Sequence, residues 1–415
     1  MRALYCTSGC RVSRCLLFIS PLFPAADATG SAKRANVFLD AFASDFEVHL
    51  VVVLLAGLPV TDDQFASLRR RCREIHVLPA AEPAESSAFH TAVPSLAHYT
   101  GGSIPGRVRE VMRSVSADVV HVFRLYLAPL AFVGDGGSGR RPRLQLDLDD
   151  YESRTHAAIA RRLRHRQQIE FAEFELAESQ RYRGWENVFI PRFDRTFVTS
   201  ERDRTLIAER FARGGIEVVP NAVEIPWKRS RSKRDRPFTL LFVGTLDYFP
   251  NDDGLVWFLE EVLPWLRAAA CGAFRVQVVG PYPSDVVLML AAEASEVEIA
   301  GFVMDVSESY HYADAVIAPI QAGGGTRIKI LEAFAFHRPV VATTSALEGI
   351  EARNGEHLLV ANDPATFAAC CLRLMSDDLL AQSIADRALE LVRARYDAPK
   401  IRSVIRRLTL SDLAS

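Results

Sequence analysis

Short apolar runs alternate with longer amphipathic stretches along most of the chain. Runs rich in Val, Ile, Leu and Phe recur from residue 15 onward, and segments of helical composition separate them. This alternation predicts βαβ units, in which crossover helices join parallel strands. The runs are apolar at consecutive positions, as expected for strands that helices cover on both faces. The strands expected in the first half are CLLFIS (15–20), EVHLVVVLL (47–55), EIHVLP (74–79), DVVHVF (118–123), LQLDLD (144–149), RTFVTS (195–200) and IEVVP (216–220).

A polar segment interrupts the pattern at 226–237, where the sequence PWKRSRSKRDRP holds six Lys or Arg and one Asp, and we interpret it as a linker. The apolar runs then restart. The strands expected in the second half are FTLLFVG (238–244), FRVQVVG (274–280), VEIAGFV (297–303), DAVIAPI (314–320), RPVVATT (338–344) and HLLVAN (357–362). The predicted fold class is therefore α/β, with two doubly wound, Rossmann-like domains that face each other across a cleft. Ligands of open α/β sheets bind at the carboxyl ends of the strands.

The length of 415 residues fits two to three domains. Arginines before residue 15 and apolar residues after it also resemble a short signal peptide, but the βαβ pattern favours a buried first strand there. The expected parts are an N-terminal domain (1–225) with a loose leader (1–14), the basic linker (226–237), a C-terminal domain (238–395), and a tail (396–415) that returns to the N-terminal domain.

Composition and charge narrow the functional classes. Hydrophobic residues make up 49% of the chain and charged residues 24%, which excludes an intrinsically disordered protein. A net charge of −2 gives no general attraction to nucleic acid. The seven cysteines form no C-x-x-C pair, which is typical of a cytoplasmic protein without a zinc cluster. The apolar run at 48–58 is too short to span a membrane.

The strongest candidate site lies at 319–336, PIQAGGGTRIKILEAFAF, where an expected strand, three glycines and a helix-forming run follow one another. Gly323, Gly324 and Gly325 have no Cβ atom, so the backbone can turn sharply and approach a ligand closely. The exposed N–H groups at the start of the helix attract anions. We expect a phosphate group to bind there.

Three charged side chains follow the glycines. Arg327 supplies a fork of hydrogen-bond donors and Lys329 a point charge. Glu332 lies about one turn after Lys329, where it can accept hydrogen bonds from ribose hydroxyls. The alternative interpretation is a glycine-rich connector followed by an ion pair on the face of a helix.

At this point the chain resembles the C-terminal domain of retaining glycosyltransferases of the GT-B fold, family 4. The resemblance covers roughly 237–398. It is carried by FVGTLDYFPNDDGLVWFLEEVLPWL (242–266), VVGPYP (278–283), IAGFVMDVSESYHYADAVIAPIQAGGGTRIKILEAFAFHRPVVATTSALEGIEA (299–352) and GEHLLVANDPATFA (355–368).

The resemblance implies that Glu332 holds the donor ribose, that the GGGTR loop holds the diphosphate, and that 301–303 presents backbone to the base. The donor-binding residues expected are Gly30, Ser31, Gly244, Thr245, Asn251, Gly301, Phe302, Val303, Gly323, Gly324, Gly325, Thr326 and Glu332. The expected catalytic residues are Arg327, Lys329, Asp149 and Asp150.

Two departures from the family pattern stand out. Many members carry two glutamates eight positions apart around the glycine loop, whereas Gly324 stands eight positions before Glu332 here. Many members also carry an Arg and a Lys after the first strand of this domain, where this chain has Gly244, Thr245 and Asn251. We expect the positive charge to come from the glycine-loop residues instead, and how the donor sugar is held is left open.

The first domain resembles the family less strongly, through 16–42. The loop before Gly30 and Ser31 either closes over the diphosphate or is an ordinary βα connection, and Arg34 faces the cleft or solvent. His121 and Arg124 end another strand near the gap, although a histidine beside apolar neighbours is more often a core residue.

Three acids, Asp147, Asp149 and Asp150, lie at the end of the expected strand 144–149. Acids at a strand end are candidates for the base that activates an acceptor. Asp147 and Asp149 also match the D-x-D pattern of a different, metal-dependent glycosyltransferase fold. We give that match no weight, because such a short pattern is common and that fold has no place for a second α/β domain. The third acid, Asp150, directly follows the pattern.

A dense basic cluster, RRLRHR (161–166), is either a solvated helix face or a surface that contacts anionic lipid. Altogether we expect a metal-independent transferase with no cofactor, which moves a sugar from a nucleotide-diphosphate donor to a glycan or lipid-linked acceptor. The resemblance implies that the transfer retains the configuration of the sugar. It would lie in the cytoplasm or at the inner membrane surface. A nucleotide-sugar epimerase of the same fold and a non-catalytic nucleotide-sugar-binding protein are the alternatives. The sequence identifies neither base, sugar nor acceptor.

Overall fold

The computed structural model describes residues 14–26, 29–54, 62–79, 99–134, 141–212, 214–226, 236–270, 274–325 and 327–414. Most of the expected leader, most of the basic linker, and Thr326 of the glycine loop therefore lie outside the described residues.

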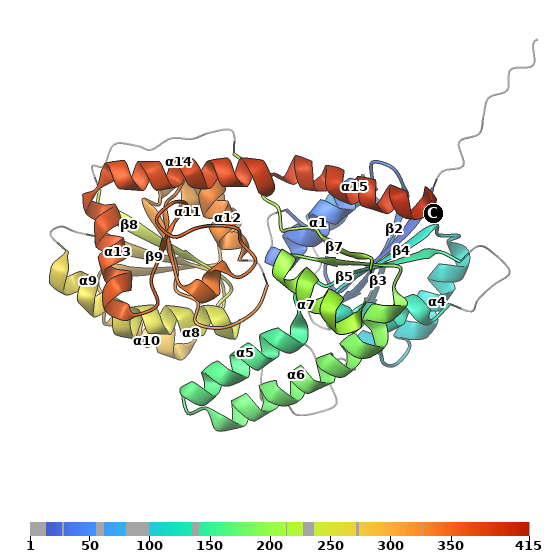
Figure 1. The fold of residues 1–415 in the computed structure, drawn as a ribbon, viewed down its shortest axis with the longest axis horizontal. Helices are drawn as coiled ribbons and strands as arrows, with labels where there is room; N and C mark the ends of the chain where they lie inside the picture. Colours follow the sequence, from blue (N-terminus) through green and yellow to red (C-terminus); the bar gives the residue numbers. More distant parts are fainter. Residues whose placement is uncertain are drawn as a thin grey trace, which may run out of the picture.

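Seven parallel strands form the first sheet, in the order β3-β2-β1-β4-β5-β6-β7 (Figure 1). The strands are β1 (Cys15–Ser20), β2 (Glu47–Leu54), β3 (Glu74–Pro79), β4 (Val119–Phe123), β5 (Arg143–Asp147), β6 (Arg195–Val198) and β7 (Ile216–Val218). The helices between them are α1 (Gly30–Phe42), α2 (Asp62–Arg69), α4 (Ile104–Ser114), α5 (Glu152–His165), α6 (Ile169–Phe189) and α7 (Glu201–Phe211), with 3₁₀ turns at Leu125–Phe132 and Ile190–Arg192. Each expected apolar run overlaps one strand, and β5 begins one residue before the run expected at 144–149.

Six parallel strands form the second sheet, in the order β10-β9-β8-β11-β12-β13. They are β8 (Phe238–Val243), β9 (Phe274–Val279), β10 (Val297–Gly301), β11 (Ala315–Ala318), β12 (Val340–Ala342) and β13 (Leu359–Val360). The helices are α8 (Phe249–Trp257), a π-helical turn (Phe258–Val262), α9 (Leu263–Ala269), α10 (Asp285–Ala292), α11 (Ser307–Tyr312), α12 (Ile328–Ala335), a 3₁₀ turn (Thr344–Leu347) and α13 (Pro364–Ser376). Both sheets have the strand order of doubly wound folds, so the predicted fold class is confirmed.

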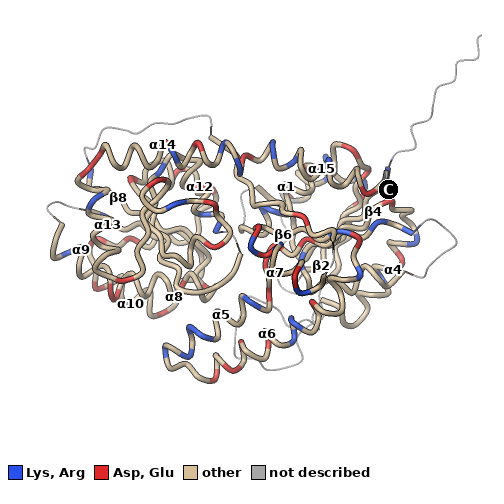
Figure 2. The backbone as a smooth tube through the Cα atoms, in the orientation of Figure 1, with Lys and Arg blue, Asp and Glu red and all other residues tan. Residues whose placement is uncertain are grey.

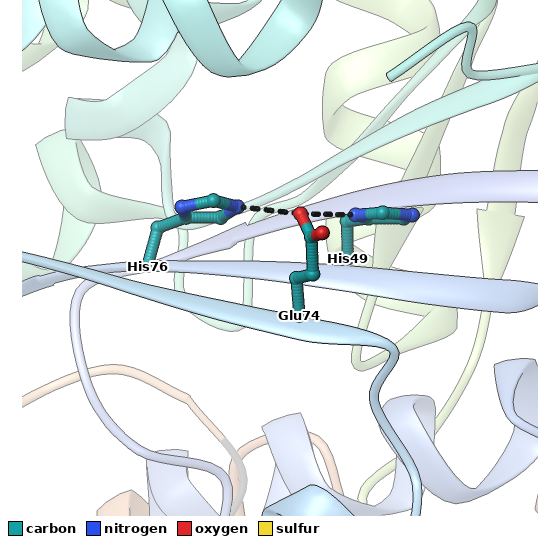
Figure 3. A group of neighbouring side chains, drawn as sticks. All are labelled: His49, Glu74 and His76. Atoms are coloured by element: carbon teal, nitrogen blue, oxygen red, sulfur yellow. Dashed lines mark ion pairs between the residues drawn. The ribbon is translucent and has the colours of Figure 1, made fainter. Parts of the chain in front are cut away.

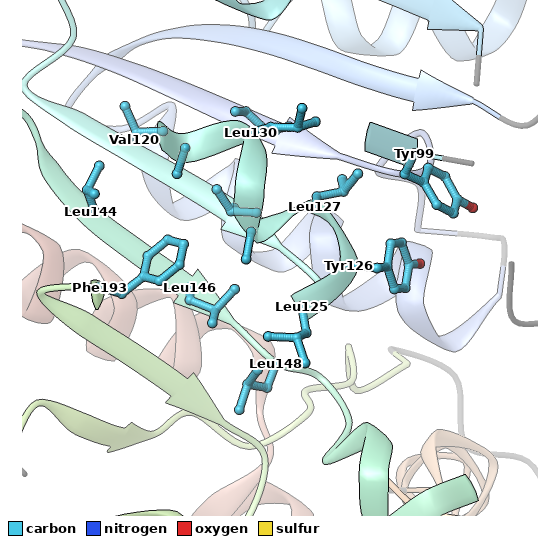
Figure 4. Close-up of a cluster of buried hydrophobic side chains, with 14 of the residues drawn as sticks. Tyr99, Val120, Leu125, Tyr126, Leu127, Leu130, Leu144, Leu146, Leu148 and Phe193 are labelled. Atoms are coloured by element: carbon cyan, nitrogen blue, oxygen red, sulfur yellow. The ribbon is translucent and has the colours of Figure 1, made fainter. Parts of the chain in front are cut away.

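Both faces of each sheet are buried. Successive side chains of a strand point to opposite sides of the sheet, so neighbouring residues of one strand belong to different cores. On β1, Leu17 and Ile19 belong to one core cluster and Leu16 and Phe18 to another. Figure 4 shows part of the first cluster, where side chains of β4, of β5 and of the 3₁₀ turn between these two strands pack together. This double burial explains why the strands read as continuous apolar runs.

His121 lies inside one of these cores and not at the gap between the domains. It is fully buried on β4 and packs against the rings of Phe18, Phe38 and Phe42. Its Nδ1 atom lies 3.2 Å from Gln145 Oε1, and burial lowers its pKa to about 3. The interpretation as a core histidine is confirmed.

Two helices, α13 and α14 (Asp378–Arg395), follow β13, because Asp377 accepts the backbone N–H of Leu380 and begins the second of them. After α14, α15 (Ala398–Ala414) crosses to the first domain, where it packs along α1 (Figure 1). None of the helices in the described residues is apolar over a length that would cross a membrane.

Candidate functional site

The candidate site lies where the start of α1, in the first domain, faces the start of α12, in the second. A Cβ atom on Gly30 would lie 3.3 Å from Ile328 Cδ1. The next residue, Ser31, donates its hydroxyl to Asp149 Oδ2 at 2.7 Å, which joins α1 to the loop after β5. The two helix starts and the β5 loop thus meet at the carboxyl ends of the two sheets, where ligands of such folds bind.

The glycine loop has the conformation that only glycine adopts readily. Gly323 and Gly325 have φ angles of 120° and 70°, in the region that side chains disfavour. A Cβ atom on Gly324 would overlap the Thr155 hydroxyl and lie 2.6 Å from Asp150 Oδ1. A side chain on Gly324 would therefore collide with residues of the first domain, which is a further reason for glycine at this position.

Arg327 stands directly before α12 and is only 9% exposed. Its Nη1 atom donates to the carbonyl oxygen of Gly324, which shapes the loop. Its Nε and Nη2 atoms are buried and make no hydrogen bond to any described residue. Buried donors are almost always paired in proteins, so this guanidinium group is available for an anion.

Lys329 lies beside Arg327 and is brought together with three residues predicted from the first loop of the domain. Its Nζ atom donates to Asn251 Oδ1 at 2.7 Å, and Asn251 in turn donates to the Thr245 carbonyl oxygen at 2.8 Å. A Cβ atom on Gly244 would lie 2.7 Å from Lys329 Nζ, so a larger residue there would displace the ammonium group from this position. Burial, and then the charge of Arg327, lower the pKa of Lys329 to about 7.

This lowered pKa predicts proton uptake when a diphosphate binds. In the free protein Lys329 is largely neutral above its pKa of about 7. A bound diphosphate stabilises the ammonium form, so binding at about pH 8 should take up nearly one proton, and binding at about pH 6 almost none from this group. Calorimetric titration with inorganic pyrophosphate in buffers of different ionisation enthalpy measures the uptake. Lys329→Met is the matched variant, and uptake that persists in it would assign the proton to another group.

Glu332, expected to bind ribose, is held by both domains. Tyr310 donates its hydroxyl to Glu332 Oε2 at 2.9 Å, and Lys33 of α1 pairs with Oε1. Lys33 and Glu332 line a cavity of about 650 Å³ between α1, α11 and α12. The sequence analysis missed Lys33, because nothing in its surroundings along the chain distinguishes it from a solvated helix lysine.

The loop after β10 borders the same cavity, but the residues that line the cavity come after the predicted residues 301–303 in the sequence. Gly301 has a φ angle of 69° and turns the chain, and Phe302 is 71% exposed. The residues of this loop that line the cavity are Met304, Asp305 and Val306. Whether Gly301, Phe302 and Val303 contact a base stays a prediction.

Glu332→Ala is expected to weaken binding of a nucleoside diphosphate by about 10- to 150-fold while the fold stays intact. The physical reason is the loss of a hydrogen bond from ribose to a charged acceptor, which contributes about 1.5–3 kcal/mol. Calorimetry with nucleoside diphosphates and with inorganic pyrophosphate provides the measurement. Pyrophosphate has no ribose, so its affinity should stay within about twofold, and an equal loss for both ligands would contradict the ribose assignment.

The D-x-D acids are both engaged in ion pairs. Asp147 is fully buried, and Arg34 donates to its two carboxylate oxygens at 2.7 and 2.8 Å. The expectation that Arg34 faces the cleft or solvent is wrong: this side chain is 2% exposed, because the pair neutralises two charges inside the domain. Asp149, with a φ angle of 54°, accepts from Ser31 and, at 2.9 Å, from Arg124 Nη1.

Asp150 is the acid that reaches the glycine loop. Its Oδ1 atom accepts from the Thr155 hydroxyl at 3.0 Å and faces Gly324 and Gly325. Burial raises the pKa of Asp150, and the charges of Arg124 and Arg327 oppose this effect. Asp150 therefore lies between cationic groups of both domains.

Arg124 connects Asp149 to a buried acid that the sequence analysis did not single out. Its Nη2 atom lies 2.7 Å from Glu152 Oε1. Burial raises the pKa of Glu152 to about 7. No sequence signal marks Glu152, which is the first residue of an ordinary amphipathic helix.

Part of the basic cluster at 161–166 binds the second domain. Arg162 Nε and Arg166 Nη1 lie 2.8 and 2.7 Å from the carboxylate of Asp253, a residue of α8 that is 2% exposed. Arg202 contributes another contact across the cleft, 2.8 Å from Glu348. Neither expected role of the cluster, a solvated face or a lipid contact, describes Arg162 and Arg166. They hold the domains together.

Residues 237–377 match the family model Glycosyl transferases group 1. An uncharacterized 44.6 kDa protein in the cps region of Klebsiella pneumoniae is 27% identical over 181 residues. The match covers 40% of this chain and 44% of that protein, less than half of its length.

Solved structures resemble the whole chain. Sucrose-phosphate synthase from Thermosynechococcus elongatus has a TM-score of 0.73 at 14% identity, over 97% of this chain and 100% of that one. HepE from Anabaena, in complex with UDP and glucose, has a TM-score of 0.66 at 15% identity, over 96% and 100% of the two chains. TarM of S. aureus, a variant of which was solved with UDP and alpha-GlcNAc-glycerol, has a TM-score of 0.65 at 11% identity, over 96% and 99%. The fold is GT-B, as the sequence predicts.

Proposed function

We propose that this chain is a glycosyltransferase that moves a sugar from UDP to a glycan or lipid-linked acceptor, with retention of configuration and without a metal ion. One observation carries the proposal. Arg327 holds two buried, unpaired donor atoms beside a glycine loop, at the cleft of a GT-B fold. The choice of UDP rests on the HepE and TarM complexes, both of which contain it.

The donor would lie along α12. Its ribose would bind Glu332 in the cavity between the domains, and its diphosphate would lie against the glycine loop, Arg327 and Lys329. The sugar would then project toward the loop after β5. Lys33, which now pairs with Glu332, would have to release one carboxylate oxygen as ribose binds.

The difficult step is departure of the diphosphate. Breaking the bond between the anomeric carbon and the phosphate oxygen leaves negative charge on that oxygen. Arg327, Lys329 and the N–H groups of the loop would stabilise that charge with donors already in position. The acceptor hydroxyl would attack from the same face and give its proton to the departing diphosphate, so the proposal needs no protein nucleophile.

Asp150 would hold the donor sugar. Family members with a glutamate eight positions before the ribose-binding one place a carboxylate on the loop itself, and Gly324 stands there in this chain. The space that a side chain on Gly324 would fill is taken by Asp150 and Thr155 of the other domain. A carboxylate is therefore present at this place, and it comes from the first domain.

Domain closure would exclude water that otherwise hydrolyses the donor. The contacts of Arg162 and Arg166 with Asp253 join α5 to α8 beside the cleft. Figure 2 shows basic residues in blue along α5, opposite the second domain. These ion pairs would favour the closed arrangement.

The function is tested first by thermal unfolding with UDP, GDP, ADP and CMP and their sugars. A ligand at 100 times its dissociation constant stabilises a protein by about 2.7 kcal/mol, so UDP and UDP-sugars should raise the melting temperature most. Release of UDP from a UDP-sugar, and its stimulation by oligosaccharide or polyprenyl-phosphate acceptors, then tests transfer. Interconversion of the sugar without acceptor would instead make the protein an epimerase. Tight binding without any turnover would make it a binding protein.

In this proposal Arg327 and Lys329 supply the positive charge needed at the diphosphate, so the reaction should not require a metal ion. Turnover should survive thorough chelation with EDTA. Activity that is abolished by EDTA, restored by Mn²⁺, and no longer responsive to Mn²⁺ in Asp149→Asn would overturn this mechanism.

The tip of the α5–α6 hairpin would bind the membrane that carries a lipid-linked acceptor. Arg161 and Arg164 are exposed there and do not belong to the Asp253 contact, and Ile169 and Phe171 are 53% and 43% exposed. Basic and apolar side chains together favour binding to anionic membranes. Sedimentation with phosphatidylglycerol vesicles, but not with phosphatidylcholine vesicles, should occur and should weaken in Arg161→Ala/Arg164→Ala. The protein would then work in the cytoplasm at the inner membrane surface, in polysaccharide synthesis.

A further inference from the structure

Three side chains capable of metal binding lie together on the first sheet, away from the cleft. His49 is on β2, and Glu74 and His76 are on β3, the strand at the edge of the sheet. The strand register pairs His49 with Glu74. Since residues two apart on a strand share a face, all three side chains project from the same side. Figure 3 shows the two imidazole rings on either side of the Glu74 carboxylate.

The distances between these side chains fit a shared metal ion better than hydrogen bonds. His49 Nδ1 and His76 Nε2 each lie 3.4 Å from the same atom, Glu74 Oε2. A hydrogen bond between nitrogen and oxygen is usually shorter than about 3.2 Å. In a tetrahedral zinc site with bonds of about 2.0–2.2 Å, neighbouring ligand atoms are separated by roughly 3.3 Å. The three ligand atoms all lie within 4.8 Å of one another.

The burial of one nitrogen atom in each imidazole ring also supports a metal ion between the three side chains. His49 is 8% exposed. Its Nδ1 atom and the Nε2 atom of His76 are buried, and neither makes a hydrogen bond to a described residue. A buried polar atom without a partner costs about 1–3 kcal/mol. A metal ion between the three groups would remove this cost at both nitrogens.

We propose that His49, Glu74 and His76 bind a divalent transition-metal ion, with Zn²⁺ as the first candidate and water in the fourth position. Imidazole ligands suit Zn²⁺ and disfavour Mg²⁺ and Ca²⁺, which bind oxygen ligands. The ion would tie the edge strand β3 to β2. All three residues lie in the first halves of their strands, whereas the cleft is at the carboxyl ends, so this ion has a structural role and takes no part in sugar transfer.

The test uses the full chain, freed of any affinity tag and stripped with EDTA. Titration with Zn²⁺ against a chromophoric chelator should show one ion per chain and a rise in melting temperature of roughly 5 °C at saturating Zn²⁺. Glu74→Gln and His76→Ala should each lower the Zn²⁺ affinity at least tenfold and remove the thermal shift. His165→Ala, which removes an exposed histidine elsewhere, is the matched control and should change neither.

Two measurements keep the outcome clear. UDP-induced stabilisation should be unchanged in both site variants, which shows that they fold and that the metal site is independent of the cleft. Co²⁺ substitution should give a spectrum without a thiolate-to-metal band. Absence of stoichiometric Zn²⁺ binding, binding that both site variants retain, or a thiolate band would each overturn the proposal.

Discussion

Arg327→Ala should lower kcat for release of UDP from a UDP-sugar by about 100- to 1000-fold, the loss typical when one preorganised donor to a developing oxyanion is removed. Its Nε and Nη2 atoms are buried without partners, so no reorganisation is needed before they bind the leaving oxygen. UDP affinity should fall much less, because charge on the bridging oxygen develops only in the transition state.

Arg267→Ala provides the control for this experiment. Arg267 is an exposed residue of α9 that pairs with Glu296 far from the loop, and its removal should leave kcat unchanged. Equal losses of kcat/KM and of UDP affinity in Arg327→Ala would make Arg327 a binding residue only. Because Arg327 also supports the Gly324 carbonyl oxygen, Arg327→Lys should recover part of the rate if charge is what matters.

Asp150→Ala is expected to lower kcat/KM for the UDP-sugar by about 10- to 150-fold, which corresponds to the loss of one charged hydrogen bond to a sugar hydroxyl. UDP lacks the sugar, so its affinity should stay within about threefold of the wild type. Calorimetry with UDP and steady-state kinetics with the UDP-sugar separate the two effects. A loss of UDP affinity as large as the loss of kcat/KM would contradict a role in holding the sugar.

A second set of variants tests where the carboxylate comes from. Gly324→Glu alone should be nearly inactive, because the new side chain collides with Thr155 and Asp150 and adds a like charge. Adding Asp150→Ala and Thr155→Ala makes room and returns a carboxylate from the loop side. The triple variant should therefore be at least tenfold more active than Gly324→Glu. If it is not, the two positions are not interchangeable.

The order of the strands and helices could be predicted from the sequence. Each of the thirteen apolar runs overlaps one strand of the structure, because a strand buried on both faces must be apolar at consecutive positions and this requirement is local. The glycine loop was equally visible, since positive φ angles and close backbone approach exclude other residues over three neighbouring positions.

Which charged groups form ion pairs could not be predicted from the sequence, because these pairings depend on tertiary packing. Lys33 and Glu332 are 299 residues apart, and Arg162 and Asp253 are 91 apart. Arg34 pairs with Asp147 inside a domain and not in the cleft. A charged residue on an amphipathic helix has the same local pattern whether it faces water, its own domain or the other domain. Its partner depends on how the sheets and helices pack over long distances, and hydrophobic periodicity carries no information about that pairing.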